Sequence, residues 1–415
     1  MLMSSTASIL KNTPATWEIL VTDAGIKKEI DTKLGQIAAY LQENLDNNQP
    51  GLLNGNGGQC LYFAYLNAYQ QTDAYNDAIG QLLENSFTAI NDRDLNTTSF
   101  CTGISGVLWT IWFLNKEGFA ELDDYFEDIM PVLETALEND SKISNFDFLH
   151  GATGLAYYLS HISQHTQPLL EAYLKNLGEK GEEDENTFKW LGQIKHGDSM
   201  RPVYNLSLSH GLASIVIVLC AMQEQMPEKE QAGRLIKKAI HYLCLQKEIP
   251  TTADDSFFPN YASTEKQERS RLGWCYGDLG TAFAFLKAGQ TLNDPSMTDE
   301  AISIMLHNTK RRDIQKAFVA DAGICHGAAG VAHMFNRFYQ HTGREEFKET
   351  ALYWLRQTLA MATFKDGIAG FKTYDGPDGW KNDSSLLDGV AGIGLALLGF
   401  VSDTEPRWDR CLLLS

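Results

Sequence analysis

Two cysteines in this 415-residue chain each stand directly ahead of a glycine-rich segment. Cys275 lies in GWCYGDLG at residues 273–280, and Cys325 lies in ICHGAAG at residues 324–330, where His326 follows it. Thiolate and imidazole groups suit a zinc ion, and three protein ligands leave the fourth position open, as in catalytic zinc sites. The sequence has no CxxC pair. Spacing alone therefore leaves a second interpretation open, in which the cysteines pack as small hydrophobic side chains.

The same glycine pattern recurs along the chain, each time followed by an apolar run. The first glycines of the repeats are Gly55, Gly103, Gly151, Gly211, Gly277, Gly327 and Gly389. The apolar runs are hydrophobic nearly all round, which is typical of helices buried on every side, whereas segments between them, such as 121–137, are amphipathic. We therefore predict seven helical hairpins, each with one inner and one outer helix.

The ends of the repeat series indicate how the hairpins are arranged. The first and last repeats are nearly as apolar as the middle ones, whereas an open array needs polar ends. We predict a single all-α domain over residues 1–415, an α/α toroid of seven inner and seven outer helices. A helical bundle or an open solenoid is the alternative. The polar segment at about 178–205 is predicted to be an inserted loop or small subdomain, which either handles substrate or only connects two hairpins.

Superposing the repeats on their first glycine gathers polar residues at one end of the ring. The residues directly before the glycines are Asn54, Thr102, His150, His210, Tyr276, His326 and Asp388. Because Cys275 and Cys325 belong to neighbouring repeats, the ring should bring both close to His326. His210, in the repeat before Cys275, and Asp147 can reach the same cavity.

Histidine and aspartate together suit proton transfer. A histidine with a pKa of ~6.5 exchanges protons at neutral pH, and a carboxylate can fix its tautomer. The alternative role of His210 and Asp147 is to cap helix starts. Arg271, four residues before Cys275, is either a surface charge or a group that stabilises an anion.

These motifs together resemble the lanthionine synthetase C-like family, which includes the cyclases that close thioether rings in lanthipeptides. The resemblance covers essentially the whole chain and rests on the seven glycine signatures, GWCYGDLG, ICHGAAG and the preceding SLSHGLA. It implies an α/α toroid around a zinc ion held by Cys275, Cys325 and His326. It also implies catalytic roles for Asp147 and His210, with Arg271 and Tyr276 close by.

The activity implied by the resemblance is the addition of a peptide cysteine thiolate to dehydroalanine or dehydrobutyrine. Zinc would deprotonate the thiol, His210 oriented by Asp147 would transfer a proton, and Arg271 would stabilise the enolate. The implied partner is a dehydrated precursor peptide, with a lanthipeptide dehydratase and an exporter as further candidates.

Other functions also fit parts of the pattern. The protein prenyltransferase β-subunit is an α/α toroid in which zinc activates a thiol, but its metal ligands include a carboxylate. A non-catalytic relative would use the zinc cavity to bind glutathione or a partner protein, against which the presence of both His210 and Asp147 argues. Asp278, directly after Gly277, either caps its helix or shapes peptide access.

Net charge and hydropathy limit the classes of partner and the cellular compartment that we expect for the protein. The net charge of −19 argues against nucleic acid, because phosphate binding needs clustered lysine and arginine. The longest apolar run, residues 389–401, is shorter than the ~20 residues that cross a bilayer. The N-terminus lacks the basic and apolar regions of a secretory signal. We expect a cytoplasmic protein whose seven cysteines form no disulfides.

Overall fold

The computed structural model describes residues 17–47, 49–92, 95–120, 126–162, 166–196, 199–223, 229–262 and 269–415. The first sixteen residues, where the sequence predicts no secretory signal, lie outside the described residues, as do residues 121–125 of the predicted amphipathic segment 121–137. No helix of the described part is both long and apolar enough to span a membrane.

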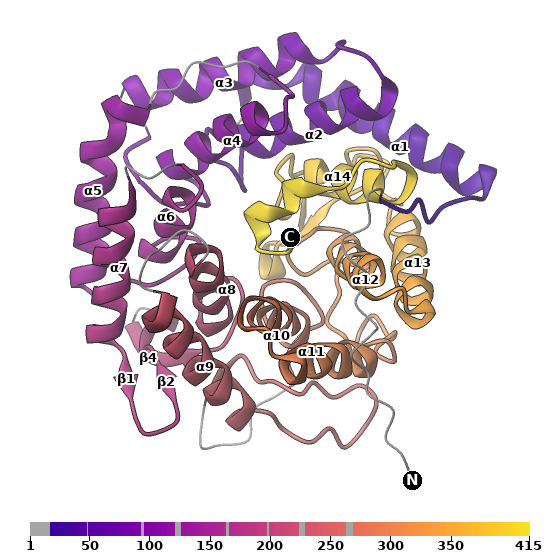
Figure 1. Cartoon of the computed structure of the whole chain (residues 1–415). Coiled ribbons are helices and arrows are strands. Elements are labelled where there is room, and N and C mark those ends of the chain that lie inside the picture. The colour runs from indigo at the N-terminus through magenta and orange to yellow at the C-terminus, as the bar shows by residue number, and fades with distance from the viewer. Residues whose placement is uncertain are drawn as a thin grey trace.

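The described helices form two concentric rings (Figure 1). The inner ring consists of α2 (Asn56–Gln70), α4 (Ile104–Lys116), α6 (Ala152–Leu159), α8 (Leu212–Gln223), α10 (Asp278–Leu292), α12 (Ala328–Thr342) and α14 (Val390–Val401). The outer ring consists of α1 (Ala24–Glu43), α3 (Asn76–Asn91), α5 (Phe126–Lys142), α7 (Gln167–Lys180), α9 (Lys229–Leu245), α11 (Pro295–Asn308) and α13 (Glu345–Ala360). The inner helices α2, α8, α10 and α12 pack mainly against the outer helix that follows each of them in the chain, and α1 packs against α14. The predicted α/α toroid of seven inner and seven outer helices is confirmed.

The burial of the two kinds of helix follows from their sequences. Every residue of α14 is buried, as its uninterrupted apolar run requires. By contrast, α1 buries a single stripe at three- and four-residue steps, formed by Ile30, Leu34, Ile37, Ala38 and Leu41. The outer helices therefore cover the inner ring with one face and present the other to solvent.

Backbone hydrogen bonds link neighbouring repeats at the end of the ring where the inner helices begin. The N–H of Leu53 donates to the carbonyl of Cys101 at 2.9 Å, and the N–H of Cys101 donates to the carbonyl of Leu149 at 3.0 Å. The same bond joins three further pairs, Ser209 to Cys275 (3.3 Å), Cys275 to Cys325 (3.2 Å) and Cys325 to Leu387 (2.9 Å). The N–H of Leu387 then donates to the carbonyl of Leu53 at 2.9 Å. This last bond joins the seventh repeat to the first, so the ring is closed and the open solenoid is excluded.

Six of the seven signatures have a second glycine, which allows neighbouring repeats to approach closely, whereas the fourth has Ser214 at that position. A Cβ added at Gly106 would lie 2.8 Å from the Cβ of Leu52 in the preceding repeat and 2.2 Å from the carbonyl oxygen of Phe100. A Cβ at Gly154 would similarly lie 2.7 Å from the Cβ of Phe100. No side chain fits at Gly106 or Gly154 without moving the backbone, which explains the glycine in these two repeats.

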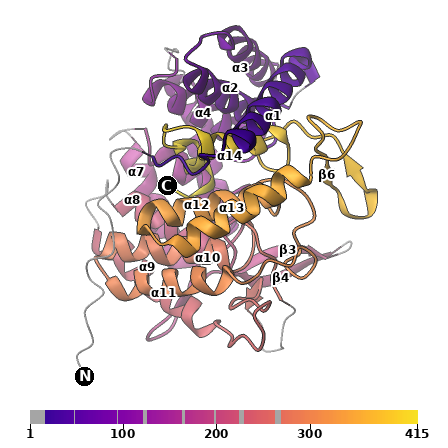
Figure 2. The same ribbon diagram turned by 90° about the vertical axis from the view of Figure 1, so that its right-hand side faces the viewer.

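Short strands lie in several of the connections between helices. Between α7 and α8, β1 (Glu182–Glu183) pairs with β2 (Phe188–Lys189), and β3 (Gly192–His196) pairs antiparallel with β4 (Ser199–Asn205). The strand β5 (Tyr261–Ala262) pairs with the end of β4. Between α13 and α14, β6 (Thr373–Tyr374) pairs with β7 (Trp380–Lys381). Figure 2 shows β3, β4 and β6 on the same side of the ring.

The residues after α14 fill the centre of the ring (Figure 1). There the 3-10 helix η4 (Arg407–Leu412) carries Asp409, whose carboxylate accepts from Nε2 of His333 at 2.6 Å and from Nε of Arg337 at 2.6 Å. The indole N–H of Trp274 donates to the carbonyl of Leu412 at 2.8 Å. His333 is thus fully buried in an ion-paired network, and these bonds join α12 and the loop before α10 to the residues after α14.

Candidate active site

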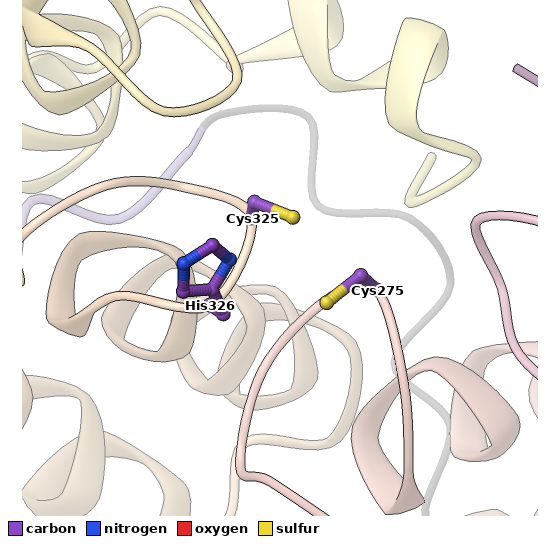
Figure 3. Close-up of side chains that lie close together, drawn as sticks. All are labelled: Cys275, Cys325 and His326. Atoms are coloured by element: carbon purple, nitrogen blue, oxygen red, sulfur yellow. The ribbon is translucent and has the colours of Figure 1, made fainter. Parts of the chain in front are cut away.

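Cys275, Cys325 and His326 come together where the inner helices begin (Figure 3). Cys275 lies in the loop before α10, whereas Cys325 and His326 lie in the loop before α12. The two sulfur atoms and a ring nitrogen of His326 all lie within 4.8 Å of one another. The backbone bond from Cys275 to the carbonyl of Cys325, at 3.2 Å, keeps these two loops adjacent.

The chemistry of this cluster fits a zinc ion. Nδ1 of His326 is buried and has no hydrogen-bond partner among the described residues. The pKa of Cys275 is lowered, chiefly by the hydrogen bond from the Cys325 thiol and further by His326 and the positive charge of Arg271. A cysteine that favours its thiolate, a second cysteine and an unsatisfied imidazole nitrogen are the donors that zinc prefers. The seven cysteines of the chain are all free thiols, so none of these donors is engaged in a disulfide.

His210 and Asp147 form a second group at the same end of the ring. His210 directly precedes the first glycine before α8, and Asp147 lies in the loop before α6. Nδ1 of His210 donates to Oδ2 of Asp147 at 2.7 Å. Burial alone would lower the pKa of His210, but the hydrogen bond and the charge of Asp147 outweigh it and raise the pKa. The neighbouring His150 donates its backbone N–H to Oδ1 of Asp147 at 2.8 Å.

Tyr276 lies near His210, whereas the charge of Arg271 acts on Cys275 and His326. The ring of Tyr276 has its centroid 6.2 Å from that of His210, and its hydroxyl is 3.4 Å from the hydroxyl of Tyr261. Burial raises the pKa of Tyr276, so its hydroxyl stays protonated. Arg271 is half-buried and close enough to the cysteine and histidine cluster for its positive charge to act on Cys275 and His326. Its side chain is therefore associated with the candidate metal ligands.

A cavity of about 660 Å³ opens beside His210. Its polar lining includes Asp147, His150, His210, Tyr261 and Tyr276. Residues 190–194 and Met200, from the segment inserted between α7 and α8, form much of the remaining lining. The sequence left two roles open for this segment, substrate handling and simple connection, because no helical period and no repeat register indicates where its residues fold.

Asp388 is a further site residue to which sequence reasoning gave no chemical role. Its Oδ1 lies 4.0 Å from Nδ1 of His326, and burial, the largest cause, raises its pKa to about 6. The signal was present, because Asp388 precedes Gly389 in the same way that His326 precedes Gly327. Asp388 thus places a carboxyl group beside the candidate metal ligands.

Asp278 is a structural residue. Its side chain is fully buried and accepts hydrogen bonds from the N–H groups of Phe257 and Phe258, at 3.0 and 2.9 Å, and from Nδ2 of Asn308 at 2.9 Å. These bonds join the loop after α9 to the start of α10 and to the end of α11. Asp278 does not line the cavity beside His210.

The chain is similar to known proteins over almost its whole length. A family model described as lanthionine synthetase C-like protein matches residues 46–413. The chain is 22% identical over 427 aligned residues to the nisin biosynthesis protein NisC of Lactococcus lactis subsp. lactis, covering 95% of this chain and 97% of NisC. It is 21% identical over 378 residues to glutathione S-transferase LANCL1 of Danio rerio, covering 88% of this chain and 86% of that protein.

The fold agrees with a solved structure. The structure of nisin cyclase superposes with a TM-score of 0.71 at 19% sequence identity, covering 94% of this chain and 98% of that chain. The match therefore shows that the two proteins share the toroid fold over almost their whole length. Together with the family model, it shows that the chain belongs to the lanthionine synthetase C-like family.

Proposed function

We propose that the protein is a zinc-dependent lanthionine synthetase that acts on a dehydrated peptide. The reaction adds the thiol of a peptide cysteine to the β-carbon of dehydroalanine or dehydrobutyrine and closes a thioether ring. The observation that carries this proposal is the presence, at one end of the ring, of a Cys-Cys-His cluster and the hydrogen-bonded pair His210 and Asp147. The similarity to proteins named nisin biosynthesis protein and nisin cyclase supports the same chemistry.

Cys275, Cys325 and His326 would hold the zinc ion. When bound, zinc would lower the pKa of a substrate thiol, so that its sulfur is a thiolate at neutral pH. The three residues leave room for one further ligand in a tetrahedral site. Asp388 lies close enough to His326 to contribute to the negative potential around this position.

His210 is the group that moves the proton. In the addition, a sulfur–carbon bond forms at the β-carbon, the electron pair of the double bond moves toward the α-carbon and its carbonyl, and the proton released by the thiol ends on the α-carbon. No external reactant is needed. Because Asp147 holds the proton on Nδ1 of His210, proton exchange is confined to Nε2. Arg271 supplies positive charge for the enolate that develops.

The direct test of this proposed reaction is to count the free thiols that remain on the peptide. Purified protein loaded with zinc is incubated with its dehydrated precursor, and the remaining free cysteines are alkylated and counted by mass spectrometry. We expect the number of alkylated cysteines to fall as rings close, because cyclisation consumes thiols without changing the peptide mass. The variant Cys275→Ala is the control for uncatalysed closure. An unchanged thiol count with a verified cognate precursor would contradict the proposal.

A second candidate function is supported by the similarity to the protein named glutathione S-transferase LANCL1. In this alternative the same cluster binds the thiol of glutathione. Calorimetry with glutathione and with the dehydrated peptide, each against the zinc-loaded protein, separates the two candidates. Tight binding of glutathione together with no ring closure would favour the second candidate.

A further inference from the structure

We propose that the segment inserted between α7 and α8 forms a specificity-determining wall of the active-site cavity and binds apolar side chains of the substrate peptide beside the reacting residue. The inference rests on the proposed cyclase function, because it names the substrate property that this site selects. We call Leu191, Ile194, Met200 and, from the loop after α5, Ile143 the apolar wall.

The apolar wall exposes large hydrophobic side chains in one place. Ile143 is 75% exposed, Met200 is 61% exposed and Leu191 is 43% exposed, and all three line the cavity that contains His210. Single exposed hydrophobic residues are common on proteins, but a group that shares one concave surface marks a binding site. The lining of the same cavity also carries the proposed catalytic residues Asp147 and His210.

The wall is attached firmly to the ring. Trp190, directly before Leu191, is only 6% exposed and donates its indole N–H to the carbonyl of Leu177 in α7 at 2.8 Å. Its ring packs against Phe188 with centroids 4.9 Å apart. On the other side, Tyr204 and Asn205 of β4 pair with β5, which carries Tyr261 next to Tyr276. The inserted strands are thus fixed both to an outer helix and to the candidate active site.

The size and polarity of the cavity define what it accepts. A volume of about 660 Å³ lies within the range of sites for ligands larger than a single side chain, so it can hold several peptide residues. Each methylene group buried against the wall strengthens binding about fourfold. A charged side chain in the same place would lose its hydration without gaining a partner from the apolar wall. We therefore expect peptides with aliphatic or aromatic neighbours of the reacting residue to be preferred.

The experiment uses two dehydrated peptides that differ only in the residue beside dehydroalanine, which is leucine in one and lysine in the other. The kcat/KM of ring closure is measured for both with the wild type, with Met200→Glu, and with Met200→Leu as the conservative variant. The matched control is Ile249→Glu, because Ile249 is 91% exposed and does not line the cavity. Zinc content and circular dichroism establish that each variant is folded and loaded.

We expect kcat/KM of the wild type to be at least tenfold higher for the leucine peptide than for the lysine peptide. Met200→Glu should lower this ratio at least tenfold. The change should arise mainly from KM, and kcat/KM for the lysine peptide should rise. Met200→Leu and Ile249→Glu should keep the wild-type ratio. Equal ratios in the wild type and in Met200→Glu would overturn the inference. If the wild type closes neither peptide, the proposed function fails instead, and fluorescence anisotropy of the same labelled peptides still tests the wall. Equal affinities for the leucine and lysine peptides, unchanged by Met200→Glu, would then refute it.

Discussion

His210 and Asp147 meet across the boundary between the third and fourth repeats, with Nδ1 of His210 donating to Oδ2 of Asp147 at 2.7 Å. The other carboxylate oxygen is held by the backbone N–H of His150 at 2.8 Å, which keeps Asp147 from rotating away. One repeat signature thus supplies the imidazole, and its neighbour supplies the group that orients it. The proposed proton-transfer group is therefore assembled from two neighbouring repeats of the ring.

Replacing His210 with alanine should separate proton transfer from metal binding. We expect His210→Ala to retain zinc, because His210 is not part of the Cys-Cys-His cluster, and to lose roughly 100-fold or more in kcat, the usual contribution of general acid–base catalysis. Zinc content and single-turnover ring closure are the measurements. Wild-type turnover in this variant would remove His210 from the mechanism.

The pH dependence of activity should respond to Asp147. Burial by itself lowers the pKa of His210, and the hydrogen bond and charge of Asp147 reverse this effect. The variant Asp147→Asn removes the charge but keeps the burial, so the pKa of His210 should fall. The limb of the kcat profile set by His210 then moves to lower pH, whichever direction the proton takes. NMR titration of His210 in both proteins is the independent check, and an unmoved pKa would contradict the role of Asp147.

The proposed ligand set predicts which cysteines hold zinc. We expect one zinc ion per chain in the wild type and its loss in Cys275→Ala and in Cys325→Ala, because two ligands bind a zinc ion far more weakly than three. Cys244→Ala is the matched control, since Cys244 is exposed on α9 and lies outside the cluster. Metal analysis after gel filtration measures occupancy. Full occupancy in both ligand variants would refute the assignment.

Two glycine-to-alanine changes should have opposite effects on stability. At Gly106 the new methyl group would meet the carbonyl oxygen of Phe100 at 2.2 Å and the Cβ of Leu52 at 2.8 Å, so we expect a loss of about 3 kcal/mol in the free energy of unfolding. At Gly80, within α3, no atom lies within 4 Å of the added Cβ, and alanine should stabilise the helix by about 0.5–1 kcal/mol. Denaturant unfolding measures both changes. A neutral Gly106→Ala would show that the repeats can separate without cost.

The architecture could be predicted from sequence because it is repetitive. Seven glycine signatures fixed the number of hairpins, and the two positions before each first glycine indicated that Cys275, Cys325 and His326 would converge. Burial of the apolar runs then determined which helices form the inner ring. These features depend on local sequence and on the symmetry of the repeat, both of which can be read directly.

The remaining features depend on contacts that break the repeat. The inserted strands are joined to β5, a segment distant in the chain, through Tyr204 and Asn205 at the end of β4, and nothing in residues 199–205 indicates that partner. The buried carboxylate of Asp278 is hydrogen-bonded to Phe257 and Asn308, which do not belong to the glycine signatures. Asp388 occupies the position directly before the first glycine of its repeat, which the sequence shows. Only the structure gives the distance between its carboxylate and His326.

The hydrogen bond from Leu387 to Leu53 also constrains how the chain can fold. Hairpins in the middle of the series can pack against neighbours as soon as these are synthesised, whereas the first hairpin has one of its two neighbours only after the seventh has emerged. Until then α2 keeps one apolar flank uncovered. Closure of the ring therefore joins distant parts of the sequence, and such contacts form slowly because a long loop must be closed. The newly made chain passes through an open, incomplete ring before the candidate active site has all of its walls.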